Sequence, residues 1–453
     1  MSKTVRIKRG KDIRLIGEAA KQIAPYQNPD VVALKPTDFV GHIPKLLLKQ
    51  GAEVKAGTPL FYDKQNEKVV FTSPVSGEVA DIVRGAKRRI LEVRILADKA
   101  NQSIDFGKMD LDSLNREQVI EKMMQAGVWP TIRQRPFSII ADPHGMPKAI
   151  HVSCFDSAPL APEMDYILEG QEKEFQAGID ALNKLCPGKV NLNLPAQGGE
   201  GFSQTQGVTV NRFSGPHPAG NVGVQVHHLD PINKGEVIWY TYPQEVIIIG
   251  RLVLEGKYDA RRRVALTGSM VSEDKRQYHE VMTGTSLRSY LHGALEKGDK
   301  RVISGNVLTG TRVDSEGFLG YFDSQVTVIP EGNEHKFLLT EGWLSPGLDR
   351  FSMSRAYPAW LMGKKKYDLD TNLNGEKRAF VVTGQLEKVF PFDIYPMQLV
   401  KAIMVNDIDN MEKMGIYEVD AEDFALPEVV CTSKIDIQKV VREGMENLRA
   451  EIS

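Results

Sequence analysis

The sequence predicts a multidomain α/β protein from its length, its composition and the change of hydrophobic period along the chain. The chain has 453 residues, more than a single hydrophobic core holds, so we expect about three domains. Short strand-like runs come first, helices then alternate with strands, and further strands and helices follow. Hydrophobic residues make up 42% and charged residues 26%, which excludes a disordered, collagen-like or disulfide-dense chain.

Charge and cysteine content exclude several classes of function. The 57 Lys and Arg against 59 Asp and Glu leave a net charge of −2, without the basic excess of a general nucleic-acid binder. Cys154, Cys186 and Cys431 stand far apart and form no C-x-x-C motif. This chain alone therefore offers no zinc knuckle or iron–sulfur site, and we expect buried thiols and no metal. No apolar run approaches the ~20 residues that span a bilayer, so we expect no transmembrane segment.

Residues 1–102 predict a small β barrel-sandwich domain. Strand-like pieces such as Pro59–Tyr62 and Lys68–Phe71 alternate with glycine turns. The segment Val54–Val79, with its glycine spacing and Ser-Pro turn, resembles a biotinyl or lipoyl carrier domain.

That resemblance places a cofactor-bearing lysine eight residues before Pro74, at Asn66 in this chain. Lys64 and Lys68 flank the position, but the motif that a modifying enzyme reads is absent. We therefore expect a barrel that serves as a structural or docking module and carries no cofactor.

Residues 103–255 predict a Rossmann-like α/β domain. A capping box at Asn115–Gln118 opens a helix that Gly127 ends. A second helix places Phe175, Ile179, Leu182 and Leu185 on one face. The strand candidates are Phe137–Ile140, Ala149–Val152, Lys189–Leu192, Gly207–Val210 and Glu245–Ile249. A parallel sheet covered by helices accommodates this order, but no G-x-G-x-x-G or P-loop is present to bind a nucleotide.

The rest of the chain divides into three parts. Residues 256–332 hold several short strands and one short helix, which predicts a β-grasp domain. Residues 333–375 form a connecting segment rich in Trp, Pro, Gly and Lys. Residues 376–453 predict a helical domain whose last helix opens at a capping box, Ser433–Asp436.

Candidate catalytic and metal sites are weak. His217, His227, His228 and Asp230 could approach a metal, but neighbouring histidines on a strand point to opposite faces and no third ligand is identifiable. We therefore expect histidines that are hydrogen-bonded within turns.

The pairs His151 with Cys154 and Ser214 with His217 lack the context of a known catalytic triad. We expect no catalytic residue in this chain.

Three basic clusters invite a binding interpretation, namely Arg84–Arg89, Arg261–Arg263 and Lys364–Lys366. Such clusters are most often solvated surface. The alternative is contact with an anionic membrane leaflet, at about 1 kcal/mol per residue.

Three motifs carry a resemblance that spans the whole chain. Gly215–Gly223 followed by His227–Pro231, the stretch Thr340–Ser352, and the opening Ile7–Leu15 resemble the A subunit of the Na⁺-translocating NADH:quinone oxidoreductases (Na⁺-NQR). That family is similar to the C subunit of Rnf complexes and to the flavin-binding subunit of respiratory complex I. The stretch from Arg263 to Ile329 resembles the soluble-ligand-binding β-grasp domain of this lineage.

The resemblance implies an electron-transfer scaffold that has lost its own cofactors. The flavin loop of the relatives corresponds to residues 127–131, where only Gly127, Pro130 and Thr131 are kept and Trp129 would occupy the space of the phosphate. Of an acidic element matching Val152–Pro159, only Asp156 remains as a partial replacement. FMN, FAD, riboflavin and iron–sulfur centres are then expected in other subunits.

The resemblance also implies a function. The chain would be a peripheral subunit on the cytoplasmic face of the bacterial inner membrane, in a six-subunit complex that oxidises NADH, reduces ubiquinone or menaquinone and exports Na⁺. Its chief partner would be the membrane-embedded B subunit. For quinone contact we select Phe39, Trp129, Arg133 and Phe137, because an aromatic and cationic loop could stack on the ring and donate to its carbonyl.

Three alternatives stay open. Trp129 and Phe137 could simply fill the degenerate flavin pocket. The chain could be a purely structural docking subunit that holds no ligand. It could also be an FMN-dependent NADH dehydrogenase that acts alone.

Overall fold

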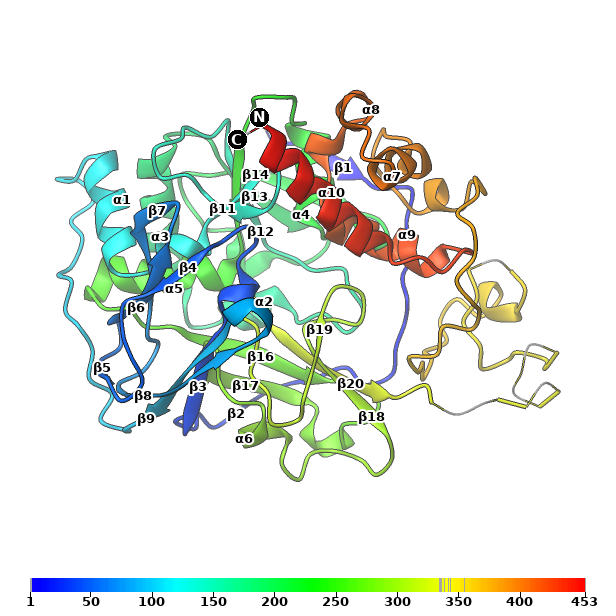
Figure 1. The fold of residues 1–453 in the computed structure, drawn as a ribbon, viewed down its shortest axis with the longest axis horizontal. Coiled ribbons are helices and arrows are strands. Elements are labelled where there is room, and N and C mark those ends of the chain that lie inside the picture. The colour runs from blue at the N-terminus through cyan, green and yellow to red at the C-terminus, as the bar shows by residue number, and fades with distance from the viewer. Residues whose placement is uncertain are drawn as a thin grey trace.

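The computed structural model describes residues 2–333, 336–337, 339–340, 342, 344–353 and 355–452. It contains an N-terminal barrel, a seven-stranded α/β sheet, a six-stranded sheet and a C-terminal group of helices (Figure 1). The predicted multidomain α/β fold is therefore confirmed.

The barrel consists of two small antiparallel sheets, as the alternating strands predict. Their strand orders are β3-β9-β8-β5 and β4-β6-β7. The bounds are β3 Val31–Leu34, β4 Pro44–Leu46, β5 Glu53–Val54, β6 Pro59–Asp63, β7 Asn66–Thr72, β8 Gly77–Arg84 and β9 Ile90–Ala97. Phe61 and Phe71 face each other across β6 and β7, with stacked rings 4.7 Å apart. Lys64 lies in the exposed turn that joins these strands.

The large sheet has the strand order β1-β14-β13-β12-β15-β10-β11. The first five strands run parallel, and β10 runs antiparallel to both of its neighbours, β15 and β11. The strands are β1 Thr4–Arg6, β10 Arg133–Arg135, β11 Ile139–Ile140, β12 Ile150–Ser153, β13 Val190–Pro195, β14 Thr209–Ser214 and β15 Ile238–Thr241. The helices are α1 Arg116–Gln125, α2 Met164–Leu168, α3 Glu172–Leu185, α4 Val222–Leu229 and α5 Pro243–Glu255.

Helices cover both faces of this sheet, as side-chain alternation along β15 shows. Trp239 packs into the core that includes α1, α3 and α5. Its neighbours Ile238 and Tyr240 pack with Val222 and Val226 of α4 on the other face. The Rossmann-like prediction is thereby confirmed as a three-layer arrangement.

Local sequence signals explain the helix ends. The capping box at Asn115 and Gln118 is present, since Asn115 accepts from the Gln118 amide and Gln118 accepts from the Asn115 amide. Gly127 ends this helical region with a φ of +74°. A Cβ atom at Gly127 would come within 2.3 Å of Thr72 on the barrel, so only glycine permits this close approach.

One predicted strand is wrong. Residues Glu245–Ile249 belong to helix α5, which begins at Pro243 and ends before Gly256 in the left-handed conformation. The helix is buried on nearly all sides, so its apolar residues do not recur with the 3.6-residue period of a half-exposed helix. Its sequence therefore resembles that of a buried strand. Glycines let α3 and α5 pack closely, because a Cβ at Gly250 would come within 1.7 Å of a carbonyl oxygen on α3.

The six-stranded sheet has the order β19-β18-β20-β16-β17-β2 and carries one short helix, α6 Arg288–Leu291. Its strands are β2 Ala20–Ala24, β16 Arg261–Thr267, β17 Gln277–Met282, β18 Lys300–Ser304, β19 Thr311–Val313 and β20 Gln325–Pro330. The β-grasp prediction is confirmed. The N-terminal segment crosses the molecule before the barrel starts, because β1 pairs with β14 and β2 pairs with β17.

The C-terminal region is helical, as predicted, and has its own apolar core. Its helices are α7 Pro396–Met404, α8 Ile408–Lys413, α9 Ala425–Val430 and α10 Ile437–Ile452. The predicted capping box at Ser433–Asp436 is wrong. Ser433 donates instead to the Ala379 carbonyl at 2.8 Å, and Glu428 accepts from the amide of Gln438 in the first turn of α10.

The connecting segment extends from one side of the molecule (Figure 1). Among its described residues only the turn Pro358–Trp360 is helical. Within the motif Thr340–Ser352, Glu341 and Trp343 lie outside the described residues. No helix in the described part of the chain is long and apolar enough to cross a membrane.

Candidate functional site

Arg133 lies where the main parts of the chain meet. Strand β10 places its half-buried guanidinium against rings from the α/β sheet and from the six-stranded domain. The guanidinium carbon is 4.2 Å from the ring centre of Phe322, 4.8 Å from Tyr240 and 5.3 Å from Tyr242. Among the described residues, Arg133 Nε has no hydrogen-bond partner. The side chain is thus fixed by cation–π contacts and keeps a donor unused.

Two cavities meet at this arginine. The larger one, of about 220 Å³, lies between the α/β sheet and the six-stranded domain and includes Asp156, His217 and Tyr242 in its walls. The smaller one, of about 80 Å³, is lined by Phe39 and by residues of the C-terminal region. Arg133, Phe322 and Glu422 line both cavities.

The electrostatics of the cavities follow from burial. Burial lowers the pKa of His217 to about 4, so its ring is neutral at physiological pH. Burial raises the pKa of Asp156 and holds that of Tyr242 well above its usual range. Burial opposes the charge of Arg133, but Tyr240, Tyr242 and Glu422 together raise its pKa above the ordinary value. Arg133 is therefore a permanent cation in this site.

A buried ion pair adjoins the site. Arg135, also on β10, has no exposed surface and contacts Asp423 at 2.8 Å and the carboxylate of Glu422. Asp423 also accepts from the amide of Asp420, which closes a capping box in this part of the chain. These contacts fix Glu422, and with it one wall of both cavities, to the α/β sheet.

The four residues selected for quinone contact lie in different surroundings. Phe39 and Arg133 come together at the smaller cavity, although 94 positions separate them in the sequence. Trp129 has no exposed surface, packs edge-on against Trp239 with ring centres 5.5 Å apart, and donates to the Ala141 carbonyl at 2.8 Å. Phe137 is buried against Tyr417 of the C-terminal region.

The segment that matches the flavin loop is packed rather than open. Trp129, Pro130 and Thr131 form a buried turn, and the Thr131 hydroxyl donates to the Val128 carbonyl at 2.7 Å. Neither Gly127, Pro130 nor Thr131 is among the residues that line the two cavities. Space that a phosphate would need beside Gly127 is filled by Thr72 of the barrel.

The expected strand placement of His227 and His228 is wrong, because both lie in the last turn of helix α4. His227 Nδ1 lies 2.6 Å from a Glu418 carboxylate oxygen, and its Nε2 accepts from the Asp393 amide. Asp230 instead pairs with Lys148 at 2.8 Å. In the described parts of the chain no group of three His, Cys, Asp or Glu residues could hold a metal ion.

The two histidines considered for nucleophilic catalysis, His151 and His217, contact other side chains than Cys154 and Ser214. His151 is buried beside Asn193, and Cys154 is a buried thiol, as are Cys186 and Cys431. His217 Nδ1 contacts the hydroxyl of Ser157 at 3.0 Å, and this hydroxyl also accepts from the Gly220 amide. The Asp12 carboxylate accepts from the main-chain amide of His217. It therefore does not orient the imidazole ring as the aspartate of a catalytic triad does.

In the cluster Arg261–Arg263 only Arg261 is exposed. Arg262 is buried and pairs with Glu245 of α5 at 2.9 Å. Arg263 donates to the carbonyls of Tyr166, Ile167 and Glu169 at 2.8 to 3.0 Å. The two arginines therefore join the six-stranded domain to the α/β domain.

Sequence reasoning missed Tyr242, Phe322 and Glu422. They come from three distant segments, and each is an ordinary aromatic or acidic residue in its own neighbourhood. Only the tertiary structure brings them to Arg133.

Family models match three parts of the chain. Residues 5–98 match the NqrA N-terminal barrel-sandwich hybrid domain, residues 114–258 match the NqrA second alpha/beta domain, and residues 263–315 match the NQRA C-terminal domain.

Whole-chain relatives agree with these matches. The chain is 36% identical over 451 residues to the A subunit of the Na(+)-translocating NADH-quinone reductase of Klebsiella pneumoniae (strain 342), covering 99% of this chain and 100% of the relative. It is 35% identical over 452 residues to the corresponding protein of Rhodopirellula baltica, covering 98% of each chain. A solved structure, an NAD⁺-reducing [NiFe]-hydrogenase in the air-oxidized state, is similar with a TM-score of 0.40 and 10% identity, over 75% of this chain and 69% of that one.

Proposed function

The chain belongs to the NqrA family, the A subunits of the Na⁺-translocating NADH-quinone reductases, and from this premise we propose that it supports quinone binding and reduction. The observation that carries the proposal is the meeting of two cavities at Arg133, a permanent cation stacked between aromatic rings. The complex as a whole oxidises NADH and translocates Na⁺, as the family name states.

The chemistry of a quinone matches this arrangement. A quinone ring is flat and apolar and carries two carbonyl acceptors, so it needs an aromatic surface and a hydrogen-bond donor. Phe39 and Phe322 offer the surface, and Arg133, which lines both cavities, offers the N–H donors of its guanidinium. A half-buried guanidinium would also stabilise negative charge that develops on the carbonyl oxygen during reduction.

We further propose that the chain binds the membrane face of the complex through its connecting segment, with the membrane-embedded B subunit as its chief partner. Nine of the 22 large hydrophobic side chains that are exposed in the described chain lie within residues 337–382, seven of them in the connecting segment and two just after it. They are Phe337, Leu339, Leu344, Leu348, Trp360, Leu361, Leu373, Val381 and Val382. Apolar side chains gathered in this way mark a surface that a partner covers.

The Arg133→Met substitution in the assembled complex tests the quinone role. It removes the donor and the charge but keeps most of the side-chain volume, so quinone reduction should fall by about tenfold to a hundredfold in kcat/KM. NADH oxidation with an artificial acceptor should stay unchanged.

Arg94→Met is the matched control, because Arg94 also stacks on a ring, that of Phe318 at 5.3 Å, outside both cavities. If Arg133→Met leaves quinone kinetics unchanged while the complex stays intact, the quinone proposal fails.

The second candidate function is a purely structural docking role. The burial of Trp129 and Phe137 favours it, because both side chains fill cores and neither lines the two cavities. Calorimetric titration of the purified chain with a short-chain quinone, repeated on the Arg133→Met variant, separates the two. Heat that disappears in the variant supports a ligand site, and absence of heat in both supports the structural role.

A further inference from the structure

The end of β1 and the residues that follow it carry three exposed basic side chains, Arg6, Lys8 and Arg9. Ile7 is buried, with 2% of its surface exposed, and its amide donates to the Ser214 carbonyl at 2.7 Å. Because side chains alternate along an extended chain, Arg6 and Lys8 point away from that core, and both are exposed. Arg9 follows and is exposed as well.

These three cations border one cavity of about 260 Å³. Helix α4 supplies His227 and His228 to the opposite side, and the segment before α7 supplies Phe392 and Asp393. The N-terminal segment lies beside the end of α4, since Lys3 Nζ donates to the Leu229 carbonyl at 3.3 Å, and β1 pairs with β14 (Figure 1). The cavity shares no residue with the two cavities at Arg133.

The cations of this cavity are unpaired. Within the described part of the chain, the side chains of Arg6, Lys8 and Arg9 have no ion pair and no hydrogen bond. The cationic groups of Lys148, Arg135 and Arg262, by comparison, are each matched by carboxylates. Three cations and one carboxylate, that of Asp393, line the cavity, so it keeps a net positive charge that an anion would neutralise.

The imidazoles of His227 and His228 are held by hydrogen bonds within the protein. His228 Nδ1 lies 2.9 Å from the Val224 carbonyl, which can only accept, so this nitrogen carries the proton. His228 Nε2 therefore carries a lone pair and can only accept a hydrogen bond, so it offers no donor to a phosphate oxygen. His227 is committed on both nitrogens, to Glu418 and to the Asp393 amide, and so it supports the wall without binding a ligand.

We propose that this cavity binds a phosphate group, carried either by a small phosphorylated molecule or by the headgroup of an anionic phospholipid. Arginine binds phosphate through two parallel N–H donors and lysine contributes a compact charge, and the cavity holds both types. The inference rests on these residues alone and is independent of the quinone proposal.

A competing explanation assigns the cations to the fold. The C-terminal end of α4 carries partial negative charge, and Lys3 Nζ already donates to the Leu229 carbonyl there at 3.3 Å. On that account, removal of the cations lowers the melting temperature and leaves anion binding unaffected.

The test uses the full chain and the double variant Lys8→Gln/Arg9→Gln, whose residues are exposed and make no described contact that folding needs. Inorganic pyrophosphate is titrated calorimetrically, and binding to phosphatidylglycerol vesicles is compared with binding to phosphatidylcholine vesicles. The matched control is Lys173→Gln/Lys297→Gln, which removes two exposed cations elsewhere. A second variant, Arg6→Gln, removes the remaining cation by itself.

We expect wild type and the control to bind at least one probe, and the double variant to bind about tenfold more weakly or worse, as the loss of charge-assisted hydrogen bonds predicts. Pyrophosphate binding identifies a small phosphorylated ligand, and binding to phosphatidylglycerol vesicles alone identifies a lipid headgroup. The proposal is overturned if wild type binds neither probe, or if both cavity variants and the control weaken binding equally.

Discussion

Trp129 is the residue for which two interpretations predict opposite results. Its indole is fully buried, packs on Trp239 and donates to Ala141. Truncation of such a side chain typically costs about 3–5 kcal/mol. We therefore expect Trp129→Ala to lower the melting temperature by many degrees and to reduce the amount of this chain in the purified complex.

A ligand role for Trp129 would produce the reverse pattern. The variant would then assemble and melt near wild type, with weakened quinone reduction and intact NADH oxidation. A stable and fully active variant would contradict both interpretations and move the quinone site to another part of the complex.

His279 links stability to pH. Burial lowers its pKa to about 4, and its Nε2 has no hydrogen-bond partner among the described residues. Because an unfolded histidine titrates near 6.5, the unfolded chain binds the proton more readily, and stability is lost as the pH falls from about 6.5 to 4. The effect for one such group is at most about 3 kcal/mol.

His279→Gln should therefore flatten the dependence of the melting temperature on pH. The difference between wild type and variant at pH 7.5 should shrink at pH 4.5, since the glutamine does not titrate. His151 and His217, whose pKa values burial also lowers to about 4, leave a residual dependence in both proteins. Parallel pH profiles would argue against the assignment to His279.

At the scale of elements, strand β10 is joined to the C-terminal region by the Arg135–Asp423 pair. Burial raises the pKa of Asp423 to about 6 even though Arg135 opposes the shift. We expect Arg135→Met to cost about 3–5 kcal/mol of stability, because it leaves a buried carboxylate without its ion-pair partner. Adding Asp423→Asn should recover part of the loss, as chemical denaturation of the single and double variants would measure.

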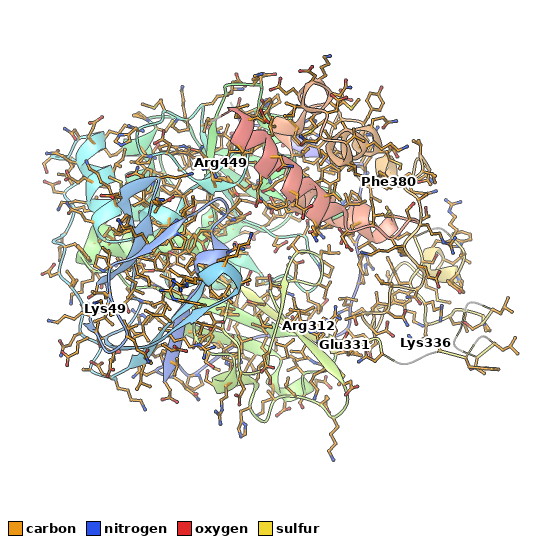
Figure 2. All side chains as sticks on the ribbon, viewed as in Figure 1. Lys49, Arg312, Glu331, Lys336, Phe380 and Arg449 are labelled. Atoms are coloured by element: carbon orange, nitrogen blue, oxygen red, sulfur yellow. The ribbon has the colours of Figure 1, made fainter. Side chains whose placement is uncertain are left out.

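An ion pair with an exposed arginine provides the comparison for this cycle. Arg312, labelled with Glu331 in Figure 2, is 68% exposed and lies 3.6 Å from that carboxylate. Its replacement by Met should cost less than about 1 kcal/mol. Equal losses at the two arginines would show that burial does not govern these pairs.

The turn between β6 and β7 is attached to helix α10 by a hydrogen bond. Arg449 of α10, labelled in Figure 2, donates to Gln65 in the turn at 2.9 Å. A carrier lysine has to swing between sites, and this contact ties the turn beside Lys64 to another element. The intact mass of the native protein should equal the sequence mass, apart from loss of Met1, and an added biotinyl or lipoyl group would make the barrel a carrier.

At the scale of the whole molecule, the purified chain should be colourless. The packed loop around Gly127 and Trp129 and the three separated cysteines motivate this expectation. Absorption near 450 nm and analysis of iron and flavin content measure it directly. Stoichiometric flavin or iron would instead favour an NADH dehydrogenase that acts alone.

The sequence by itself determined features that depend on near neighbours. The capping box at Asn115 and the alternation of β6 and β7 follow from short-range periodicity and hydrogen bonding, and both are present as predicted. The motifs around Gly215 and Ile7 also led to the correct family. These signals are local, so a single sequence contains them in full.

Only the tertiary structure decided features made by distant segments. Helix α5 resembles a strand in sequence because nearly all of its sides are buried. Strands β1 and β2, which precede the barrel in the sequence, pair with strands of the two other sheets. The aromatic rings that contact Arg133 come from β15, from the start of α5 and from the loop before β20. Trp129, four residues earlier in the sequence, is buried in a hydrophobic core instead. Long-range packing sets these outcomes, because burial depends on which surfaces meet and the local pattern of residues does not specify the partner.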